Sequence, residues 1–470
     1  MKRNKPHIFR CGSCSHEEPK WLGRCPECSE WNTFVEIAVS SAVTSRMENK
    51  TLPESFPLSS VDPIEGKRIS SGIEELNRVL GGGIMKRSAV LLGGEPGIGK
   101  STLLLQTAAA AETKGRILYI SGEESAGQVR MRADRIGAGS LDRIEICCTG
   151  RMEDILLILE AAKPVLIMVD SAQTLHTDEA GPAPGTINQM KFCAYELISW
   201  IKEHDAVLFL SAHVTKDGLI SGPKTIEHMV DTVLYFELGV SGDAGNADCR
   251  FLRAVKNRFG SVDEIGIFTM GEKGLAEVDD PSLLFLVRRE GTIPSGIATA
   301  AVLEGSRSLL VELQALTVPA KGSISRVFSD RVDNARVSRV AAVIEKHLGL
   351  RLSDQDIYVN VAGGIRIAEV GVELALACAI YSARTGVPAP AKTAIAGELS
   401  LAGEVRPLRR LSTRLRAARN LGFTEFLCPV GEAAAPPAEE APPLEGFSGV
   451  KDIREAVKAL FAGDILSSAP

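Results

Sequence analysis

One short segment limits the possible folds of this chain more than any other. Residues 94–101 read Gly-Glu-Pro-Gly-Ile-Gly-Lys-Ser, which matches the pattern G-x4-G-K-[ST] in full. An apolar stretch, 89–92, precedes it, and a helix is expected from Lys100 to about Thr113. Glycines let backbone amides wrap phosphate oxygens, and the helix N-terminus adds its positive end. The segment therefore predicts a phosphate-binding loop in an α/β fold.

This loop assigns roles to its side chains. Lys100 is expected to reach the β- and γ-phosphates of ATP, and the Ser101 hydroxyl is expected to bind Mg²⁺. An apolar strand, 165–169, ends at Asp170, where the second acidic group on the Mg²⁺ side is expected. The residues predicted to bind the nucleotide and its metal are Gly94, Glu95, Pro96, Gly97, Ile98, Gly99, Lys100, Ser101, Thr102 and Asp170.

Two more apolar strands end in polar residues that would share one edge of a mostly parallel sheet. The strand 117–120 is followed by Glu123 and Glu124, and a carboxylate there could deprotonate the attacking water. We expect Glu123 to be the base and keep Glu124 as the alternative, although either could simply favour the next helix N-terminus. After the strand 207–210, His213 is a candidate sensor of the γ-phosphate or of a bound strand, or a structural residue.

Four of the ten cysteines lie in the first 28 residues. Cys11 and Cys14 form one C-x2-C pair, and Cys25 and Cys28 form a second after ten intervening residues. Two such turns complete a tetrahedral shell of four thiolates around Zn²⁺. Two disulfides or a redox-active pair are the alternatives, but redox pairs are rarely doubled at this spacing. A closed shell has no open position, so we expect a structural zinc.

The composition is typical of a globular protein from a reducing compartment. Of 470 residues, 45% are hydrophobic and 24% are charged. The basic N-terminus leads into Cys11 without an apolar segment, and no apolar run reaches the roughly 18 residues of a membrane span. We expect a cytoplasmic protein that does not use a membrane. The net charge of −6 does not indicate nucleic-acid binding, for which a local basic surface would nevertheless suffice.

The chain is expected to divide into four regions. Residues 1–36 form the cysteine module, 37–67 a Ser-, Thr- and Pro-rich linker, 68–280 an α/β domain and 281–470 an α+β domain. The elements expected in the last region are strands at 298–303, 309–316 and 357–361, helices at 331–347 and 371–385, and an Ala-, Pro- and Glu-rich surface loop at 432–443.

The pentapeptide Lys256-Asn257-Arg258-Phe259-Gly260 resembles the signature of the RadA (Sms) family of bacterial DNA repair proteins. The other segments similar to that family are 71–76, 79–83, 121–125, 170–171, 213–216 and the four-cysteine module. The resemblance departs at 85–88, where the family has a proline–glycine turn. It covers nearly the whole chain and implies a RecA-like P-loop ATPase core, an N-terminal zinc module and a C-terminal Lon-protease-like domain.

The resemblance also implies a function. It points to a helicase-like, hexameric ring on single-stranded and branched DNA, which works with the recombinase RecA and drives branch migration in recombinational repair. On this basis Lys256 and Arg258 would act across a subunit boundary on the neighbour's nucleotide, where a cation stabilises transition-state charge. The residues alone would favour a plainer interpretation, a basic strand end paired with surface acids.

The C-terminal region resembles the proteolytic domain of Lon proteases, notably at 397–405. Lon-type proteolysis needs a serine activated by a lysine. The serine position falls at Gly371 and the lysine position near Ser412, so we expect no protease activity. A helix could present the following basic stretch to DNA phosphates or merely to solvent: Arg406, Arg409, Arg410, Arg414, Arg416 and Arg419.

Three functions are therefore compared. The first is a DNA-dependent ATPase motor, the second an ATP-dependent protease, and the third a RecA-fold ring whose ATP cycle times the binding of a protein partner, as in KaiC-like proteins. Gly371 and Ser412 argue against the second. The phosphate loop does not separate the first from the third, but 256–260 and the cysteine module favour the motor. The direction of translocation, the ring size and the contacts of the zinc module stay open.

Overall fold

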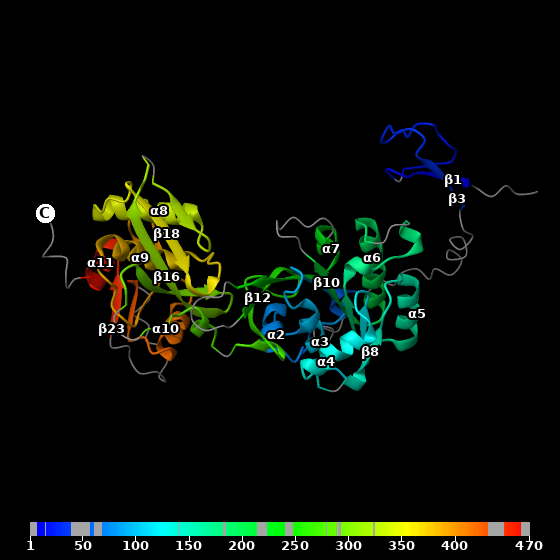
Figure 1. Ribbon diagram of the computed structural model, residues 1–470, viewed down its shortest axis with the longest axis horizontal. Helices are drawn as coiled ribbons and strands as arrows, with labels where there is room; N and C mark the ends of the chain where they lie inside the picture. The colour runs from blue at the N-terminus through cyan, green and yellow to red at the C-terminus, as the bar shows by residue number, and fades with distance from the viewer. Residues whose placement is uncertain are drawn as a thin grey trace, which may run out of the picture. The chain divides into compact units, whose positions relative to one another are not determined.

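The computed structural model describes residues 7–14, 16–38, 57–60, 68–139, 141–181, 185–213, 223–239, 248–278, 280–287, 289, 293–322, 325–430 and 446–461. The chain forms two compact units, Met1–Glu65 and Gly66–Pro470, each of which is described by itself (Figure 1). Most of the predicted linker 37–67, Lys216 and the predicted loop 432–443 lie outside the described residues. The four domain limits drawn from the sequence stay predictions.

The first unit contains a small antiparallel sheet with the strand order β2-β1-β3. These strands are β1 (His7–Cys11), β2 (Glu17–Glu18) and β3 (Phe34–Ala38). The buried hydrophobic cluster of this unit consists of Cys11, Cys25 and Phe34. A core of this size cannot stabilise a fold without a further constraint such as a metal.

The N-terminal part of the second unit contains a nine-stranded sheet of order β14-β13-β12-β11-β6-β10-β9-β7-β8. Its strands are β6 (Ala89–Gly94), β7 (Ile117–Ser121), β8 (Ile144–Cys147), β9 (Leu166–Asp170), β10 (Val207–His213), β11 (Thr232–Leu238), β12 (Asp248–Asn257), β13 (Ile265–Gly271) and β14 (Gly274–Glu277). The six strands from β11 to β8 are parallel, and β12, β13 and β14 are antiparallel. The phosphate-loop strand β6 is therefore central, between β10 and β11.

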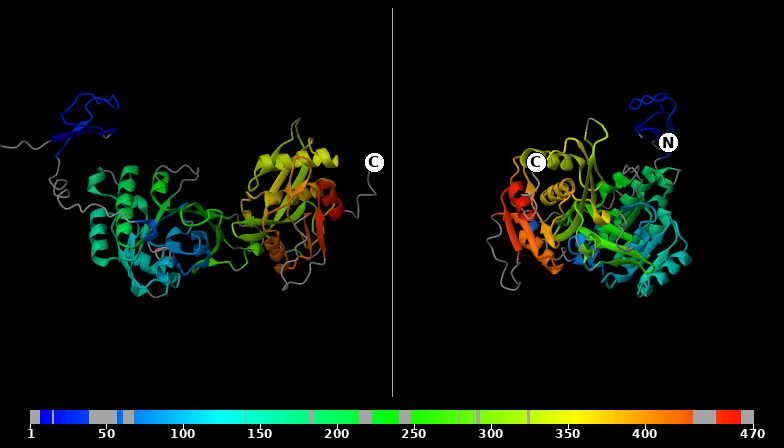
Figure 2. Two further views of the ribbon diagram at one scale, coloured as in Figure 1. Left: turned by 180° about the vertical axis from the view of Figure 1, so that it is seen from behind. Right: turned by 60° about the vertical axis from the view of Figure 1, so that its left-hand side comes forward.

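Helices cover both faces of this sheet, which explains why the central strands β6, β7, β9 and β10 are buried almost throughout. One apolar cluster joins the sheet to α2, α3 and α4, and a second joins it to α5, α6 and α7 (Figures 1 and 2). Their bounds are α2 (Glu74–Leu80), α3 (Lys100–Ala110), α4 (Ala126–Arg135), α5 (Met152–Ala162), α6 (Ile187–Glu203) and α7 (Pro223–Met229). Helix α3 ends three residues before the predicted Thr113, and the Arg143 guanidinium binds the carbonyls of Ala109, Ala111 and Thr113.

The turn before β6 shows how this chain departs from the family pattern at 85–88. It lies between β5 (Ile84–Met85), the partner of β4 (Arg68–Ile69), and β6. Arg87 adopts a left-handed conformation with φ of 55°, a region that glycine occupies more readily. Its guanidinium is paired with Asp205. The departure thus changes a turn on the side of the sheet away from the phosphate loop.

The C-terminal part of this unit contains a seven-stranded mixed sheet of order β17-β18-β16-β15-β19-β22-β23. Its strands are β15 (Ile297–Glu304), β16 (Arg307–Pro319), β17 (Val327–Ser329), β18 (Gln355–Val361), β19 (Thr393–Ile395), β22 (Glu425–Pro429) and β23 (Gly446–Val450). Helices α8 (Asn334–Leu348), α9 (Glu373–Thr385) and α11 (Ile453–Phe461) share one apolar cluster with it, and α10 (Leu411–Asn420) shares another (Figure 2). The predicted strands and helices of this region are present, with shifted ends.

A buried ion pair links the two sheets of this unit. Arg307, at the start of β16, donates to both carboxylate oxygens of Glu75 on α2. The same carboxylate accepts the backbone N–H of Ile267 on β13 at 2.9 Å. Nearby, Arg253 of β12 lies 3.1 Å from Glu304 of β15. These ion pairs therefore hold the turn between β15 and β16 against the nine-stranded sheet.

Each helix within the described part of the chain is too short or too polar to cross a membrane.

Candidate functional site

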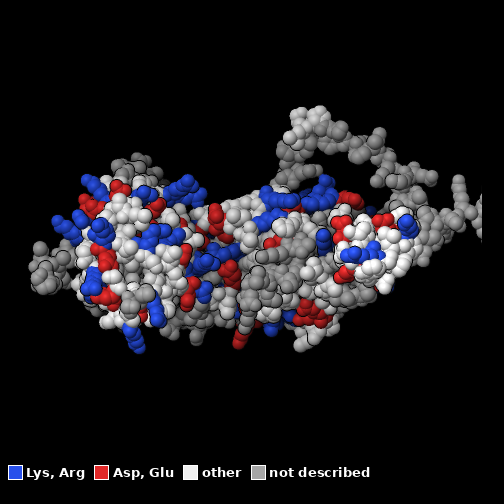
Figure 3. Space-filling model, turned by 90° about the horizontal axis from the view of Figure 1, so that it is seen from above, with Lys and Arg blue, Asp and Glu red and all other residues white. Residues whose placement is uncertain are grey.

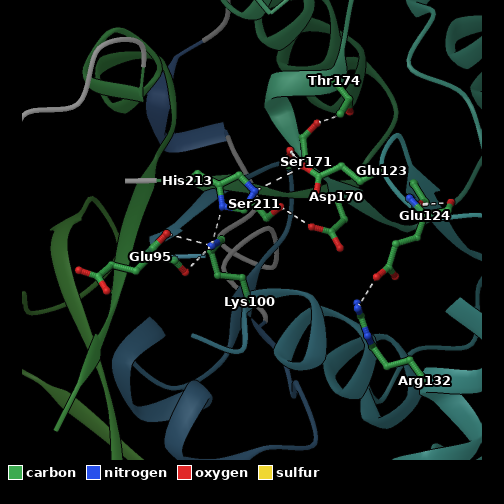
Figure 4. A network of polar contacts seen from close by, with 12 residues as sticks. Glu95, Lys100, Glu123, Glu124, Arg132, Asp170, Ser171, Thr174, Ser211 and His213 are labelled. Carbon is green, nitrogen blue, oxygen red and sulfur yellow. Dashed lines mark hydrogen bonds and ion pairs between the residues drawn. The ribbon is translucent and has the colours of Figure 1, made fainter. Parts of the chain in front are cut away.

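The Lys100 ammonium lies inside the phosphate loop, at the first residue of α3. Its Nζ donates to the carbonyls of Gly94 and Glu95, both at 2.9 Å, and lies 3.1 Å from Nδ1 of His213 (Figure 4). Burial lowers the pKa of Lys100 to about 8, although the charges of Asp170 and Glu123 act in the opposite direction. Among the described residues, no carboxylate lies within ion-pair distance of this ammonium. The loop therefore offers an unneutralised cation to an anionic ligand.

The Asp170 carboxylate ends β9 and is buried beside the loop. Its Oδ1 accepts the Ser211 hydroxyl at 2.6 Å, and its Oδ2 accepts the Tyr119 hydroxyl at 3.0 Å. Burial, followed by the charge of Asp170, raises the pKa of Tyr119 well above its usual value, so this hydroxyl stays a donor. Two donors hold the carboxylate in one orientation and leave further lone pairs for a hydrated cation.

The neighbouring acids Glu123 and Glu124 differ sharply in their contacts (Figure 4). Oε1 of Glu123 accepts the Ser171 hydroxyl at 2.5 Å and lies 3.4 Å from Nε2 of His213. Oε1 of Glu124 is instead paired with Arg132 of α4 at 2.5 Å. Glu123 thus points to the edge where Lys100 and Asp170 lie, whereas Glu124 is tied to α4.

A cavity of about 890 Å³ lies over the phosphate loop, which is within the size range of small-molecule sites. Its lining residues are Pro96, Gly97, Gly99, Lys100, Ser101, Thr102, Glu123, Glu124, Arg132, Arg135, His213, Met270, Gly271, Glu272 and Gly274. The sequence had not indicated Arg132, Arg135 or the segment 270–274, because they reach the cavity from α4 and the β13–β14 turn. Gly99 has φ of 117°, and a Cβ there would lie 2.7 Å from Met270. The cavity fits a nucleotide whose phosphates bind the loop.

The four cysteine thiols of the first unit converge on one point. Their sulfur atoms all lie within 4.8 Å of one another, with 3.6 Å from Cys11 to Cys28 and 3.5 Å from Cys14 to Cys25. A disulfide would require about 2.05 Å. Tetrahedral zinc with bonds of about 2.3 Å separates its sulfur ligands by about 3.8 Å. The four thiols therefore fit one zinc ion and not two disulfides.

Three family models match separate parts of this chain. Residues 9–36 match the rubredoxin metal binding domain, residues 54–218 match the AAA domain, and residues 323–432 match subunit ChlI of Mg-chelatase. An N-terminal zinc ribbon, an ATPase domain of the P-loop class and a C-terminal α+β domain are thus combined in one chain.

Comparison with whole proteins identifies the family. The chain is 56% identical to the DNA repair protein RadA of Treponema pallidum over 441 residues, which cover 93% of this chain and 95% of that protein. This chain belongs to the RadA family of DNA repair proteins. It is also 41% identical to RadA of Bacillus subtilis over 97% of this chain and 98% of that protein, and 42% identical to RadA of Mycobacterium tuberculosis over 92% and 90%. The resemblance and the fold class inferred from the sequence are confirmed.

The RadA signature, 256–260, lies at the opposite end of the sheet from the phosphate loop. Lys256 pairs with Val233 of β11, whereas Gly94 of the loop pairs with Phe236 of the same strand. Val233 and Phe236 are three residues apart along β11, which corresponds to about 10 Å. Lys256 and Arg258 are therefore not brought to the nucleotide site of their own chain.

A β-bulge determines the face of the sheet on which the Lys256 side chain lies. The register between β11 and β12 passes from Leu234–Ala254 to Val233–Lys256, so Val255 is the extra residue. Leu252 and Ala254 belong to the apolar cluster on the α2–α4 side, whereas Val233 belongs to the cluster on the α5–α7 side. Directly paired residues share a face, so the bulge turns Lys256 to the α7 side. There its Nζ binds the carbonyls of Glu227, His228 and Val230.

In the C-terminal domain of this RadA-family chain, an ion pair lies beside Gly371, the residue predicted to occupy the serine position of Lon proteases. Arg414 of α10 donates to the two oxygens of Glu369 at 3.0 and 2.9 Å and to the Ala301 carbonyl at 2.6 Å. A Cβ on Gly371 would lie 2.7 Å from both Glu369 oxygens. Ser412 is exposed, whereas the Arg414 side chain is only 1% exposed. The expectation that Arg414 could bind DNA is therefore wrong, because it is buried and neutralises Glu369.

Proposed function

We propose that this chain is a DNA-dependent ATPase of recombinational repair, a helicase-like hexameric ring that promotes branch migration on single-stranded and branched DNA beside the recombinase RecA. The observation that carries this proposal is the meeting of Lys100, Glu123, Asp170 and His213 at the carboxyl ends of β6, β7, β9 and β10. The proposal that the chain acts on DNA and in recombinational repair rests on its membership of the RadA family.

In the proposed reaction the loop amides and Lys100 bind the phosphates of ATP. Ser101 and Asp170 would hold Mg²⁺, which neutralises charge that develops on the phosphates. Glu123 is the group that we assign to orient a water and accept its proton, because Ser171 holds its Oε1 and no arginine among the described residues pairs with it. His213 contacts both Lys100 and Glu123, so it is placed to respond when a γ-phosphate displaces the ammonium from it.

The same proposal assigns Lys256 and Arg258 to the neighbouring subunit's nucleotide. Arg258 is more than half exposed, at 57% of its side chain, and both residues are remote from their own phosphate loop. A cation that acts only in an assembled ring makes hydrolysis depend on assembly. Two observations support this action in trans. The signature lies away from its own phosphate loop, and it occurs in a chain of the RadA family.

Proteolysis is not part of the proposed function. Gly371 has no nucleophile, and the adjacent buried cation is Arg414, which cannot lose a proton to serve as a base. We propose that this domain is a scaffold for the ring and for DNA. Arg406, Arg409 and Arg416 are exposed on it. Lys and Arg side chains form several groups on the face shown in Figure 3, with Asp and Glu between them, so contacts with DNA would be dispersed.

The test is the rate of ATP hydrolysis with and without single-stranded DNA, for the native chain and for Lys100→Ala. We expect clear stimulation by DNA and no hydrolysis above background in the variant. Stimulated hydrolysis would then be followed by branch-migration assays on three- and four-stranded junctions. A rate indifferent to DNA would contradict the motor and would favour a ring that switches a protein partner.

A further inference from the structure

The Asp231 carboxylate is the centre of a charge cluster that the phosphate site does not use. Asp231 directly precedes β11 and is only 3% exposed. Its Oδ2 accepts from Nζ of Lys202 at 3.0 Å and from the backbone N–H of Ala89 at 3.1 Å. Its Oδ1 accepts from Nη1 of Arg258 at 3.2 Å. One buried carboxylate thus joins the end of α6, the start of β6 and the RadA signature.

The five residues that end at Asp231 bind both cations of the signature. Lys256 donates to the carbonyls of Glu227, His228 and Val230, where α7 ends. Arg258 donates from its backbone N–H to the carbonyl of Asp231 at 3.1 Å and from its guanidinium to the carboxylate. Segment 227–231 therefore supplies the acceptor groups that bind Lys256 and Arg258.

The two cations are held in different ways. Lys256 uses three carbonyls and is turned inward against α7. Arg258 contacts the buried carboxylate through Nη1 of its guanidinium, and 57% of its side chain remains exposed. The backbone N–H of Ala89 fixes the carboxylate even without Lys202, and the carboxylate in turn restricts the guanidinium without covering it. A preoriented arginine loses less rotamer entropy when it binds a phosphate.

We propose that Asp231 is a positioning residue, which holds Arg258 at the protomer edge in the orientation that meets the neighbouring subunit's nucleotide. This inference rests on the proposed action of Arg258 in trans. The plainer alternative is that Asp231 only stabilises its own fold by joining α6 to β6. The two roles differ in what Lys202 should do, because Lys202 shares the carboxylate but has no part in reaching a neighbour.

The experiment compares Asp231→Asn with two single variants, Arg258→Ala and the matched control Lys202→Met. An asparagine can still accept the Ala89 N–H but carries no charge. An arginine supplied in trans contributes about 10³–10⁵ in kcat, and its misplacement should forfeit a large part of that factor. We expect Asp231→Asn to lower kcat at least about tenfold with the affinity for ATP unchanged. Lys202→Met should hydrolyse ATP at close to the native rate.

Mixing subunits distinguishes a positioning role from a structural one. Lys100→Ala protomers have no working phosphate site but carry an intact Asp231 and Arg258. We expect them to restore hydrolysis when they are mixed with Asp231→Asn protomers before assembly on DNA, and equally with Arg258→Ala protomers. A defect confined to the variant's own fold would not be rescued, and that result would overturn the proposal.

Other outcomes separate this inference from the function on which it rests. If Arg258→Ala hydrolyses ATP at the native rate, the action in trans fails and this inference fails with it. If Arg258→Ala is inactive but rescued while Asp231→Asn equals the native chain, the inference alone is wrong. Should Asp231→Asn lose ATP binding through misfolding, Asp231→Glu, which keeps the charge, is mixed in the same way. Failure of Lys100→Ala protomers to rescue it would then overturn the proposal.

Discussion

Glu123 and Glu124 differ in the side chains that contact them. Glu123 receives a hydroxyl from Ser171 and faces His213, and its side chain is 44% exposed. Glu124 is paired with Arg132, which neutralises its charge and occupies one of its oxygens. A general base must be within reach of water, and a permanently charged arginine bound to a carboxylate lowers its affinity for a proton. These contacts favour Glu123 for the role.

Glu123→Gln should therefore abolish turnover and spare binding. General-base catalysis contributes about 10²–10⁴-fold, so we expect a loss of that order in kcat with an unchanged affinity for ATP. Glu124→Gln is the matched control and should lower kcat by less than about tenfold, since it only weakens the pair with Arg132. Steady-state hydrolysis and equilibrium binding of a fluorescent ATP analogue measure both quantities. A larger loss of kcat in Glu124→Gln would reverse the assignment.

Residues that follow a strand or a glycine turn directly could be found in the sequence. Lys100, Asp170 and Glu123 have such local signals, and the structure places them together. The contacts of Tyr119, Ser171 and Ser211 could not be predicted, because they depend on the register between β7, β9 and β10. Sequence separation hides these partners: Ser211 lies 41 residues from the carboxylate that it binds.

Helix α10 shows how an element can mislead when it is interpreted by its charge alone. Its arginines follow one another in sequence, but Arg414 is buried against Glu369 whereas Arg416 is exposed. The helical period turns successive arginines toward the sheet or toward solvent. The sequence marked Arg414 as basic, and only the contact with Glu369, 45 residues away, reveals its structural role.

Arg414→Met should destabilise the C-terminal domain. It would leave the Glu369 carboxylate, which is 19% exposed, with the backbone N–H of Gly371 but without its cation. Removing one partner of a buried pair costs about 3–5 kcal/mol. Arg416→Met, on the exposed side of the same helix, should change the free energy of unfolding by less than about 0.5 kcal/mol. Urea unfolding followed by circular dichroism measures both, and equal midpoints would contradict the buried pair.

The strands and helices were largely predictable because the apolar pattern repeats within each element. The residues at which helices and strands begin and end were less predictable. Helix α8 begins at Asn334, after the Asp333 side chain caps the N–H of Ala335, and not at the predicted Arg331. The bulge at Val255 had no signal in the sequence, because valine is an ordinary strand residue. This bulge decides which face Lys256 uses, so the orientation of the RadA signature required the structure.

At the scale of the whole molecule, the pair Glu75–Arg307 joins elements 232 residues apart. The Glu75 side chain is 4% exposed and also accepts the N–H of Ile267, and its charge is balanced by Arg307 together with the more distant Arg78 at 3.8 Å. We expect a double-mutant cycle of Glu75→Gln and Arg307→Met to give a coupling of about 1–3 kcal/mol in the free energy of unfolding. The exposed pair Arg130–Asp134 is the control and should couple by less than about 0.5 kcal/mol. Equal couplings would mean that the two sheets are not held together by this contact.

The two compact units predict that zinc and ATP act on separate parts of the chain. The described residues that line the nucleotide cavity lie between Pro96 and Gly274, and the four clustered thiols lie between Cys11 and Cys28. We expect one zinc ion per native chain, none in Cys25→Ser, and one in the control Cys148→Ser, whose thiol is exposed and outside the cluster. A chromophoric chelator added after denaturation measures the zinc. Titration with ATP should give the same affinity for all three proteins, because the first unit collapses without its metal while the second keeps its own apolar clusters. A loss of ATP affinity in Cys25→Ser alone would show that the zinc ribbon supports the nucleotide site.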